Sequence, residues 1–252
     1  VILGLFIGFR NATFLTPRNI NNMLINYSIT LILSLGMICV LLIGGIDISI
    51  GSILALSGMV SALVLRDFPQ TSVITAFIIA IAVGGLCGLM NGLIIAKGKV
   101  PPIIATMGSM NALRGITYLV ADNKWVAAYQ IPDRFKDFAT GKYLGFGLIN
   151  NMIVVTAIIS VVFFYFLKYT PTGRKIYAIG SNPQAAEVSG INITRIKIFS
   201  YTLMGLLCGL SGALWVSLYA SAQGDMAMGI EMNIIAACVI GGVSLAGGRG
   251  SI

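Results

Sequence analysis

The chain has 252 residues, of which 57% are hydrophobic and 10% are charged, and its formal net charge is +8. Its mean hydropathy of +0.94 exceeds what the core of a soluble domain holds, so composition excludes an ordinary soluble protein and indicates a membrane protein. The sixteen basic residues are scattered over several loops, a distribution typical of membrane topology signals rather than of nucleic-acid binding.

Stretches without Asp, Glu, Lys or Arg predict membrane-spanning helices, because roughly 17 to 25 apolar residues cross a bilayer as a helix. The apolar run at residues 1–9 is interpreted as the end of a first, partial span. Further helices are predicted at residues 24–44, 48–65, 73–96, 101–120, 146–167, 199–219 and 232–243. A transmembrane barrel is rejected, because these segments lack an alternation of apolar and polar residues. The predicted fold class is therefore all-α, a polytopic transmembrane helix bundle with about eight spans.

Gly44 and Gly45 interrupt the apolar sequence between two predicted spans and predict a structural break. Asp47 follows the break and has two interpretations. Either it coordinates a cation or a proton, since ionisable residues inside a membrane are costly and usually functional, or it is a helix N-cap or turn residue, which its position favours. Together with Glu231, at the start of the last predicted helix, Asp47 would serve an ion-coupled carrier.

Few polar side chains lie in or beside the predicted spans. The candidates for lining a translocation path are Asn91, Asn111, Arg114 and Gln223. Arg114 has three interpretations, because its long side chain would snorkel, contact a polar substrate or pair with a carboxylate across the bundle. Glycines at four-residue spacing predict faces on which helix backbones approach closely, with packing favoured over a mobile substrate path. These are Gly84, Gly88 and Gly92 in one helix and Gly205 and Gly209 in another.

The chain contains no histidine, which excludes a histidine-based metal site and a Ser-His-Asp triad. It also contains no Gly-x-x-x-x-Gly-Lys-Ser/Thr sequence, so it is not expected to hydrolyse ATP through a P-loop. We therefore predict no enzymatic activity, no catalytic residue, and no metal or cofactor bound by this chain. Energy for uphill transport would come from an ion gradient or from a partner subunit.

Two hydrophilic segments, residues 122–142 and 168–197, decide the predicted orientation. The second has five basic residues against four in the first, which makes it the better cytoplasmic candidate. It also predicts a short helix, with Ser181 or Asn182 as the N-cap, Pro183 in the first turn and Gly190 as a left-handed stop. Such a helix is either a knob that inserts into a cleft of another protein or a rigid cytoplasmic connection.

Four stretches in this order carry a family resemblance. They are residues 44–52 (GGIDISIGS), residues 91–97 with 100–108 (NGLIIAK and VPPIIATMG), residues 172–191, and residues 236–248 (AACVIGGVSLAGG). Together they resemble the membrane-spanning permease subunits of bacterial ATP-binding-cassette importers for simple sugars, the group of ribose, xylose, rhamnose and autoinducer-2 importers. The resemblance covers nearly the whole chain and implies a location in the bacterial inner membrane.

The resemblance implies that residues 168–198 form a cytoplasmic coupling loop that docks on the ATPase subunit. The residues implied in coupling are Gly180, Asn182, Pro183, Gln184, Ala185, Ala186, Glu187, Gly190 and Ile191. Within them, Gln184-Ala185-Ala186 with Gly190 resembles the Glu-Ala-Ala-x-x-x-Gly pattern of importer permeases, with Gln184 in place of the glutamate. Residues 1–252 would be a single permease domain, truncated at both ends, since such permeases have about ten spans.

The expected function is a permease subunit that translocates a rhamnose-type or ribose-type monosaccharide, or autoinducer-2, into the cytoplasm. The alternative is an ion-coupled secondary transporter. The expected partners are a cytoplasmic ATPase that binds ATP and Mg, a second permease protomer in a homodimer or heterodimer, membrane lipid, and an extracytoplasmic sugar-binding protein that docks on outer loops such as residues 122–142. No nucleic acid is expected among them.

Overall fold

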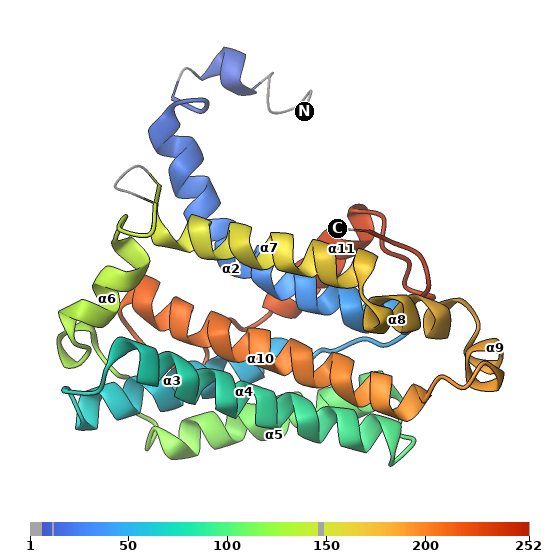
Figure 1. Ribbon diagram of the computed structural model, residues 1–252. Coiled ribbons are helices and arrows are strands. Elements are labelled where there is room, and N and C mark those ends of the chain that lie inside the picture. The colour runs from blue at the N-terminus through green and yellow to red at the C-terminus, as the bar shows by residue number, and fades with distance from the viewer. Residues whose placement is uncertain (1–6, 12, 146–148, 252) are drawn as a thin grey trace.

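The computed structural model describes residues 7–11, 13–145 and 149–251, and these ranges form a bundle of helices without a named strand (Figure 1). The helices are α2 Pro17–Leu42, α3 Ile50–Asp67, α4 Val73–Ala96, α5 Pro102–Val120, η1 Ala128–Gln130, α6 Asp133–Thr140, α7 Asn151–Tyr169, α8 Pro171–Ser181, α9 Pro183–Val188, α10 Ile193–Tyr219 and α11 Ile230–Ile240. The predicted all-α class is confirmed.

Five helices, α2, α3, α4, α7 and α10, are long and apolar enough to cross a membrane. α5 has 19 residues but contains Asn111 and Arg114, and its hydropathy falls below that of the five. α11 has 11 residues and is about 16 Å long, whereas the hydrocarbon core of a bilayer is about 30 Å thick. Of the first predicted span, residues 1–6 lie outside the described residues. Of the predicted spans, α5 is thus less apolar than the five, and α11 is shorter than they are.

Several helices extend beyond the apolar stretches that predicted them. α2 begins at Pro17, where Thr16 Oγ1 accepts a hydrogen bond from the Asn19 N–H at 3.4 Å. α10 begins at Ile193, where Asn192 Oδ1 accepts from the Arg195 N–H at 2.9 Å. A charge-free stretch marks the apolar part of a helix, whereas the capping residue marks its start.

α10 lies at the centre of the bundle, between the layer of α3, α4 and α5 and the layer of α2 and α7 (Figure 1). It packs most extensively against α4, and then against α3 and α2. α6 and α9 lie at opposite ends of the bundle. The two hydrophilic segments of the sequence therefore occupy opposite ends, as alternating spans require.

Glycines form the contact between α4 and α10. A Cβ atom on Gly84 would lie 2.7 Å from Gly209 Cα, and one on Gly88 would lie 2.8 Å from Gly205 Cα. Real Cβ atoms essentially never approach other atoms so closely, so the two backbones touch directly. The packing interpretation of the four-residue spacing is confirmed.

We expect Gly88→Ala to lower the apparent melting temperature of the detergent-solubilised protein, because the added methyl group pushes α4 from α10 and overpacking typically costs about 1–3 kcal/mol. The control is Gly115→Ala in α5, where a Cβ atom would meet nothing within 4 Å. There the better helix propensity of alanine should leave stability unchanged or raise it by about 0.5–1 kcal/mol. Equal melting temperatures for the two variants would contradict the glycine contact.

Candidate coupling helices and translocation path

α9 is the short helix that the sequence predicted in the second hydrophilic segment. Asn182 is its N-cap, with Oδ1 accepting a hydrogen bond from the Ala185 N–H at 3.0 Å. Pro183 occupies the first turn, where its missing N–H costs no intrahelical hydrogen bond. Of the two caps that the sequence left open, the structure uses Asn182, because Ser181 is the last residue of α8.

α9 ends in a left-handed glycine. Gly190 has a φ of +79°, a conformation that a side chain disfavours. The Gly190 N–H donates to Glu187 O at 2.9 Å, and the Ile191 N–H donates to Ala186 O at 3.0 Å. These two bonds form a Schellman motif, which satisfies carbonyl groups left free at the helix end. The predicted stop at Gly190 is confirmed.

The residues implied in coupling lie mostly on the surface. Those that are exposed are Asn182, Pro183, Gln184, Ala185, Glu187 and Gly190. Val188, which sequence reasoning did not single out, is 91% exposed. Ala186 differs, because it is only 4% exposed and packs toward the body of the protein. Gly180 and Ile191 are half-buried.

The sequence did not predict α8, an 11-residue helix between α7 and α9. Thr170 caps it, with Oγ1 accepting a hydrogen bond from the Gly173 N–H at 3.1 Å, and Pro171 occupies its first turn. The signal that could have revealed α8 is this Thr-Pro pair, an N-cap followed by a first-turn proline.

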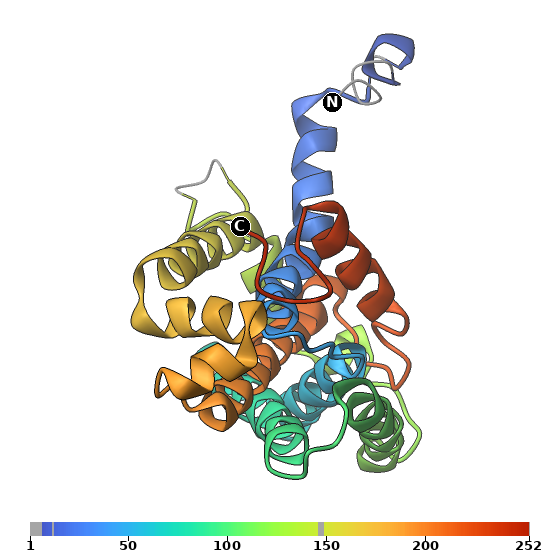
Figure 2. The ribbon, with the colours of Figure 1, turned by 90° about the vertical axis from the view of Figure 1, so that its right-hand side faces the viewer.

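α8 meets the end of α2 through glycine backbone. A Cβ atom on Gly180 would overlap Leu42 O and lie 2.9 Å from Gly248 Cα. The Gly248 N–H donates to Leu42 O at 2.9 Å, and the Tyr177 hydroxyl donates to Gly250 O at 2.9 Å. Figure 2 shows the C-terminal segment, in red, crossing in front of the end of α2. The end of α8, the end of α2 and the glycine-rich residues 247–250 thus form one junction beside α9.

The predicted break follows α2. Gly44 has a φ of +73°, and no regular structure forms from residue 45 until α3 begins at Ile50. Asp47 is 0% exposed, and its Oδ1 accepts hydrogen bonds from the Ser49 N–H at 2.8 Å and the Ser49 hydroxyl at 2.6 Å. It is therefore a turn residue that bonds backbone two positions on. Ser49, not Asp47, holds the N-cap position of α3.

Two of the path candidates, Asn91 and Asn111, differ in burial. Asn91 is 0% exposed, and its Nδ2 donates to Ser49 Oγ at 2.8 Å, so it ties α4 to the break. Asn111 is exposed on α5, where its Nδ2 donates to Met107 O of the same helix. Of the two, Asn111 has the exposure that a path-lining residue needs.

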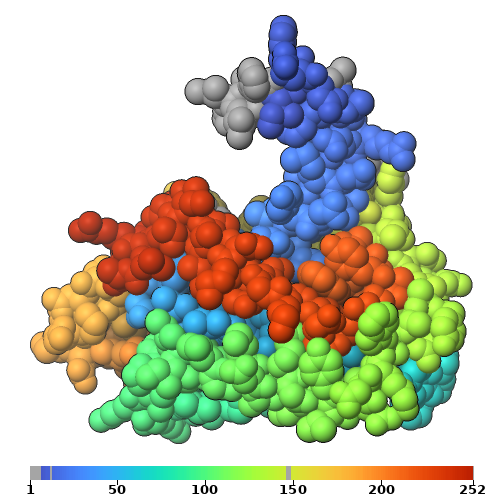
Figure 3. All heavy atoms as spheres, turned by 180° about the vertical axis from the view of Figure 1, so that it is seen from behind, coloured from blue at the N-terminus to red at the C-terminus, as the bar shows by residue number. Residues whose placement is uncertain are grey.

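Arg114 binds the connection between α10 and α11, and Gln223 is part of that connection. Arg114 Nη1 donates to Gly224 O at 2.7 Å and to Met226 O at 2.9 Å, so this arginine binds main-chain carbonyl groups. Figure 3 shows α5, in green, beside this connection, in orange, on one face of the molecule. Gln223 lines a cavity of about 270 Å³ together with Trp215, Tyr219, Ser221, Asp225 and Met226.

The first hydrophilic segment, residues 122–142, lies at the end of the bundle opposite α9 and is hydrogen-bonded to the bundle. Ser217 of α10 donates to Phe135 O at 2.5 Å and accepts from the Ala139 N–H at 3.1 Å, which holds α6 in place. Arg134 donates to Pro69 O and to Thr71 O in the connection between α3 and α4. The segment is therefore anchored to two other parts of the chain.

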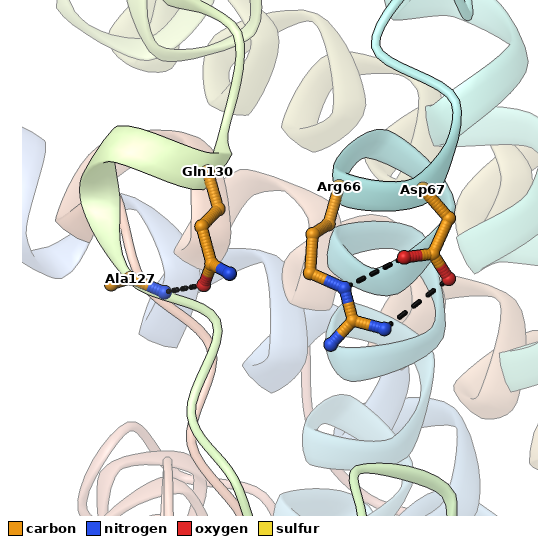
Figure 4. Close-up of polar contacts among 4 residues, drawn as sticks. All are labelled: Arg66, Asp67, Ala127 and Gln130. Carbon is orange, nitrogen blue, oxygen red and sulfur yellow. Dashed lines mark hydrogen bonds and ion pairs between the residues drawn. The ribbon is translucent and has the colours of Figure 1, made fainter.

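A cavity of about 640 Å³ lies between this segment and the end of α3, and its lining includes Arg66, Tyr129 and Lys136. Figure 4 shows Arg66 bound to Asp67, with Nε 2.7 Å from Oδ1, and Gln130 accepting a hydrogen bond from the Ala127 N–H. Lys136 Nζ lies 2.7 Å from Asp133 Oδ1, and this bond holds the pKa of Asp133 below its usual value. The basic groups of the cavity are thus paired with carboxylates.

We expect Asn182→Ala to speed hydrogen exchange of the α9 amides, because losing an N-cap typically costs about 1 kcal/mol and α9 has only six residues. Asn182→Asp is the matched control, since a carboxylate keeps an acceptor for the Ala185 N–H. Exchange is measured by mass spectrometry on a peptide covering residues 183–191. A rise in both variants would mean that the cap is not what orders α9.

The family model described as branched-chain amino acid transport system / permease component matches residues 19–249. The ribose import permease protein of Haemophilus influenzae is 39% identical over the whole chain, which covers 77% of that relative. The ribose import permease protein of Bacillus subtilis is 38% identical over the whole chain and 76% of its own length. For the galactose/methyl galactoside import permease protein of Escherichia coli K12 the values are 35% over the whole chain and 78%. No solved structure matches the chain.

A match to membrane permeases agrees with the helix bundle and with its five helices that are long and apolar enough to cross a membrane. The family model runs from the first turn of α2 to the glycine-rich segment after α11. Because it covers more than half of the chain, this protein belongs to the branched-chain amino acid transport system / permease component family: it is a multi-pass permease subunit of the bacterial inner membrane and not an enzyme.

Proposed function

We propose that this chain is the permease subunit of an ATP-binding-cassette importer that carries a ribose-type monosaccharide into the cytoplasm. Ribose import permease proteins of three bacteria are 37–39% identical to it over the whole chain. An arabinose permease and a galactose permease are each 34% identical. Of the substrates that the sequence left open, which include rhamnose-type sugars and autoinducer-2, the ribose type therefore has the strongest support.

The observation that carries the proposal is the exposed, capped helix α9. Its ends are satisfied by its own Asn182 cap and Gly190 stop, so it stays formed without a partner. It presents Val188, which is 91% exposed, and burying a valine side chain contributes roughly 1.5–3 kcal/mol. We infer that α9 seats in a groove of the cytoplasmic ATPase. ATP and Mg would bind to that partner.

Val188→Arg should abolish co-purification of the ATPase with the tagged full-length permease, because a groove that buries valine would have to desolvate a charge. Membrane insertion should be unchanged, since Val188 contacts little of its own chain. The control is Tyr129→Arg, at a side chain that is 87% exposed beside α6, the helix at the opposite end of the bundle from α9, and it should leave the ATPase bound. Unaltered association of the Val188 variant would remove α9 from the interface.

The transport activity is tested in proteoliposomes that contain the full-length permease, its ATPase and a ribose-binding protein. Uptake of radiolabelled ribose should require ATP and should continue when an uncoupler dissipates the proton gradient. Uptake that survives ATP depletion but collapses with the uncoupler would instead support the ion-coupled alternative based on Asp47 and Glu231.

The entry to the translocation path is proposed at the cavity beside Gln223. The rings of Trp215 and Tyr219 have centroids 4.7 Å apart and supply apolar ring faces. Ser221, Gln223 and Asp225 supply hydrogen-bond donors and acceptors. This combination suits a monosaccharide, which has apolar C–H faces and hydroxyl groups. α5, the helix that contains Asn111 and Arg114, borders the same face (Figure 3), and a second permease protomer facing it would close the path.

The extracytoplasmic sugar-binding protein is proposed to dock on the segment that contains η1 and α6. Trp125 and Tyr129 are 68% and 87% exposed there, and aromatic side chains are enriched in protein interfaces. Because Ser217 holds this segment against α10, the docking surface is fixed in position. A fixed surface costs less ordering entropy on binding.

A further inference from the structure

Asp47 is the fully buried carboxyl group of this chain. Of the eight Asp and Glu residues, it is the one with 0% exposure, and it lies in the break between α2 and α3. Its Oδ1 accepts two hydrogen bonds from Ser49. Its Oδ2 has no hydrogen-bond partner among the described residues.

No positive charge in the described part of the chain is paired with Asp47. The ion pairs there involve Arg66, Lys124 and Lys136. The titratable groups of α10 that are near enough to interact electrostatically with Asp47 are the Tyr201 phenol and the Cys208 thiol, which are uncharged at neutral pH in their ordinary state. An isolated ionised carboxylate is so unfavourable in an apolar interior that such groups are paired or neutralised.

Asn91, which bonds Ser49 from α4, also has a buried oxygen that needs a hydrogen-bond donor. Its Nδ2 donates to Ser49 Oγ at 2.8 Å, and the same hydroxyl donates to Asp47 Oδ1 at 2.6 Å. Asn91 Oδ1 also has no hydrogen-bond partner among the described residues. Asp47 Oδ2 and Asn91 Oδ1 are therefore two fully buried acceptors at the ends of one hydrogen-bonded chain, and the described residues supply neither with a donor.

We propose that Asp47 is held as a neutral carboxylic acid whose hydrogen completes a ring with Ser49 and Asn91. Asn91 Nδ2 donates to Ser49 Oγ, Ser49 Oγ donates to Asp47 Oδ1, and Asp47 Oδ2 donates to Asn91 Oδ1. Each of the three side chains then donates and accepts, and the ring has no net charge. Asp47 is a positioning residue, since the ring fixes Ser49 at the start of α3 and joins the break to α4. Its proton is a fixed part of the fold and not a transported ion.

Asp47→Asn tests the ring, because asparagine keeps the Oδ1 acceptor for Ser49 and replaces the acid hydrogen with an Nδ2–H donor toward Asn91. The full-length Asn variant should retain the native melting temperature and, in the complete importer, the native rate of ribose uptake. In Asp47→Leu the new side chain has a similar size but neither polar atom, so this variant should have a lower melting temperature and a lower rate of ribose uptake. An Asn variant as impaired as the Leu variant would mean that the negative charge itself is needed, which overturns the proposal.

Infrared spectroscopy of the purified permease tests the proton directly and does not depend on the proposed transport function. The native protein at neutral pH should have a C=O stretching band of a protonated carboxylic acid that is missing from Asp47→Asn. Glu231→Gln is the control, because Glu231 is half-exposed on α11 and should not contribute to that band. Identical spectra for the native protein and Asp47→Asn in this region, as expected for a carboxylate bound to water or to a cation, would overturn the proposal. If the native protein has this band but the importer assembled from it does not take up ribose, the result would count against the proposed importer function and not against the protonated Asp47.

Discussion

The direct backbone contact between α4 and α10 is the constraint on which the rest of the structure depends. In lipid no hydrophobic effect drives helices together, so association rests on close packing and hydrogen bonds. Glycines also allow close packing where α10 meets α3 and α2. A Cβ atom on Gly212 would lie 2.6 Å from Leu54 O of α3, and one on Gly36 of α2 would lie 2.5 Å from Met204 Sδ. Three neighbouring helices, α2, α3 and α4, thus approach α10 closely at glycine residues.

This central helix also connects the two ends of the molecule. It has 27 residues, which gives a length of about 40 Å. At one end it follows α9 after the Asn192 cap, and at the other end Ser217 holds the segment that contains α6. One continuous helix therefore links the neighbourhood of α9 to the segment that contains α6.

The second connection from α9 into the bundle runs through α8 to the end of α2. Gly180 and Gly248 pack on Leu42 there, and five residues further along the chain Asp47 enters the polar network with Ser49 and Asn91. The junction beside α9 and the buried network are thus consecutive along one short segment. Because glycine leaves no side chain between the backbones at the junction, α8 and the end of α2 are in direct backbone contact there.

The sequence by itself determined the features that depend on neighbouring residues. Charge-free stretches located the long helices, glycine spacing identified the closely packed faces of α4 and α10 but not that these two faces meet, and the Asn-Pro and glycine signals located α9. What the side chains do over long distances was decided by the tertiary structure. Asn91 bonds Ser49 across 42 positions and Arg114 bonds Gly224 across 110, so their roles as ties between helices could not be read locally.

Burial was likewise decided only in three dimensions. Ala186 belongs to the same pattern as Ala185, yet it packs inward while Ala185 is exposed. Asp47 could be placed after a glycine break from sequence, and its two bonds to Ser49 are local, but its complete burial depends on the helices that pack around the break, among them α4, whose Asn91 bonds Ser49. The physical reason is that local sequence specifies backbone conformation and apolar length, whereas the partner of a polar atom depends on which distant segment the packing brings beside it.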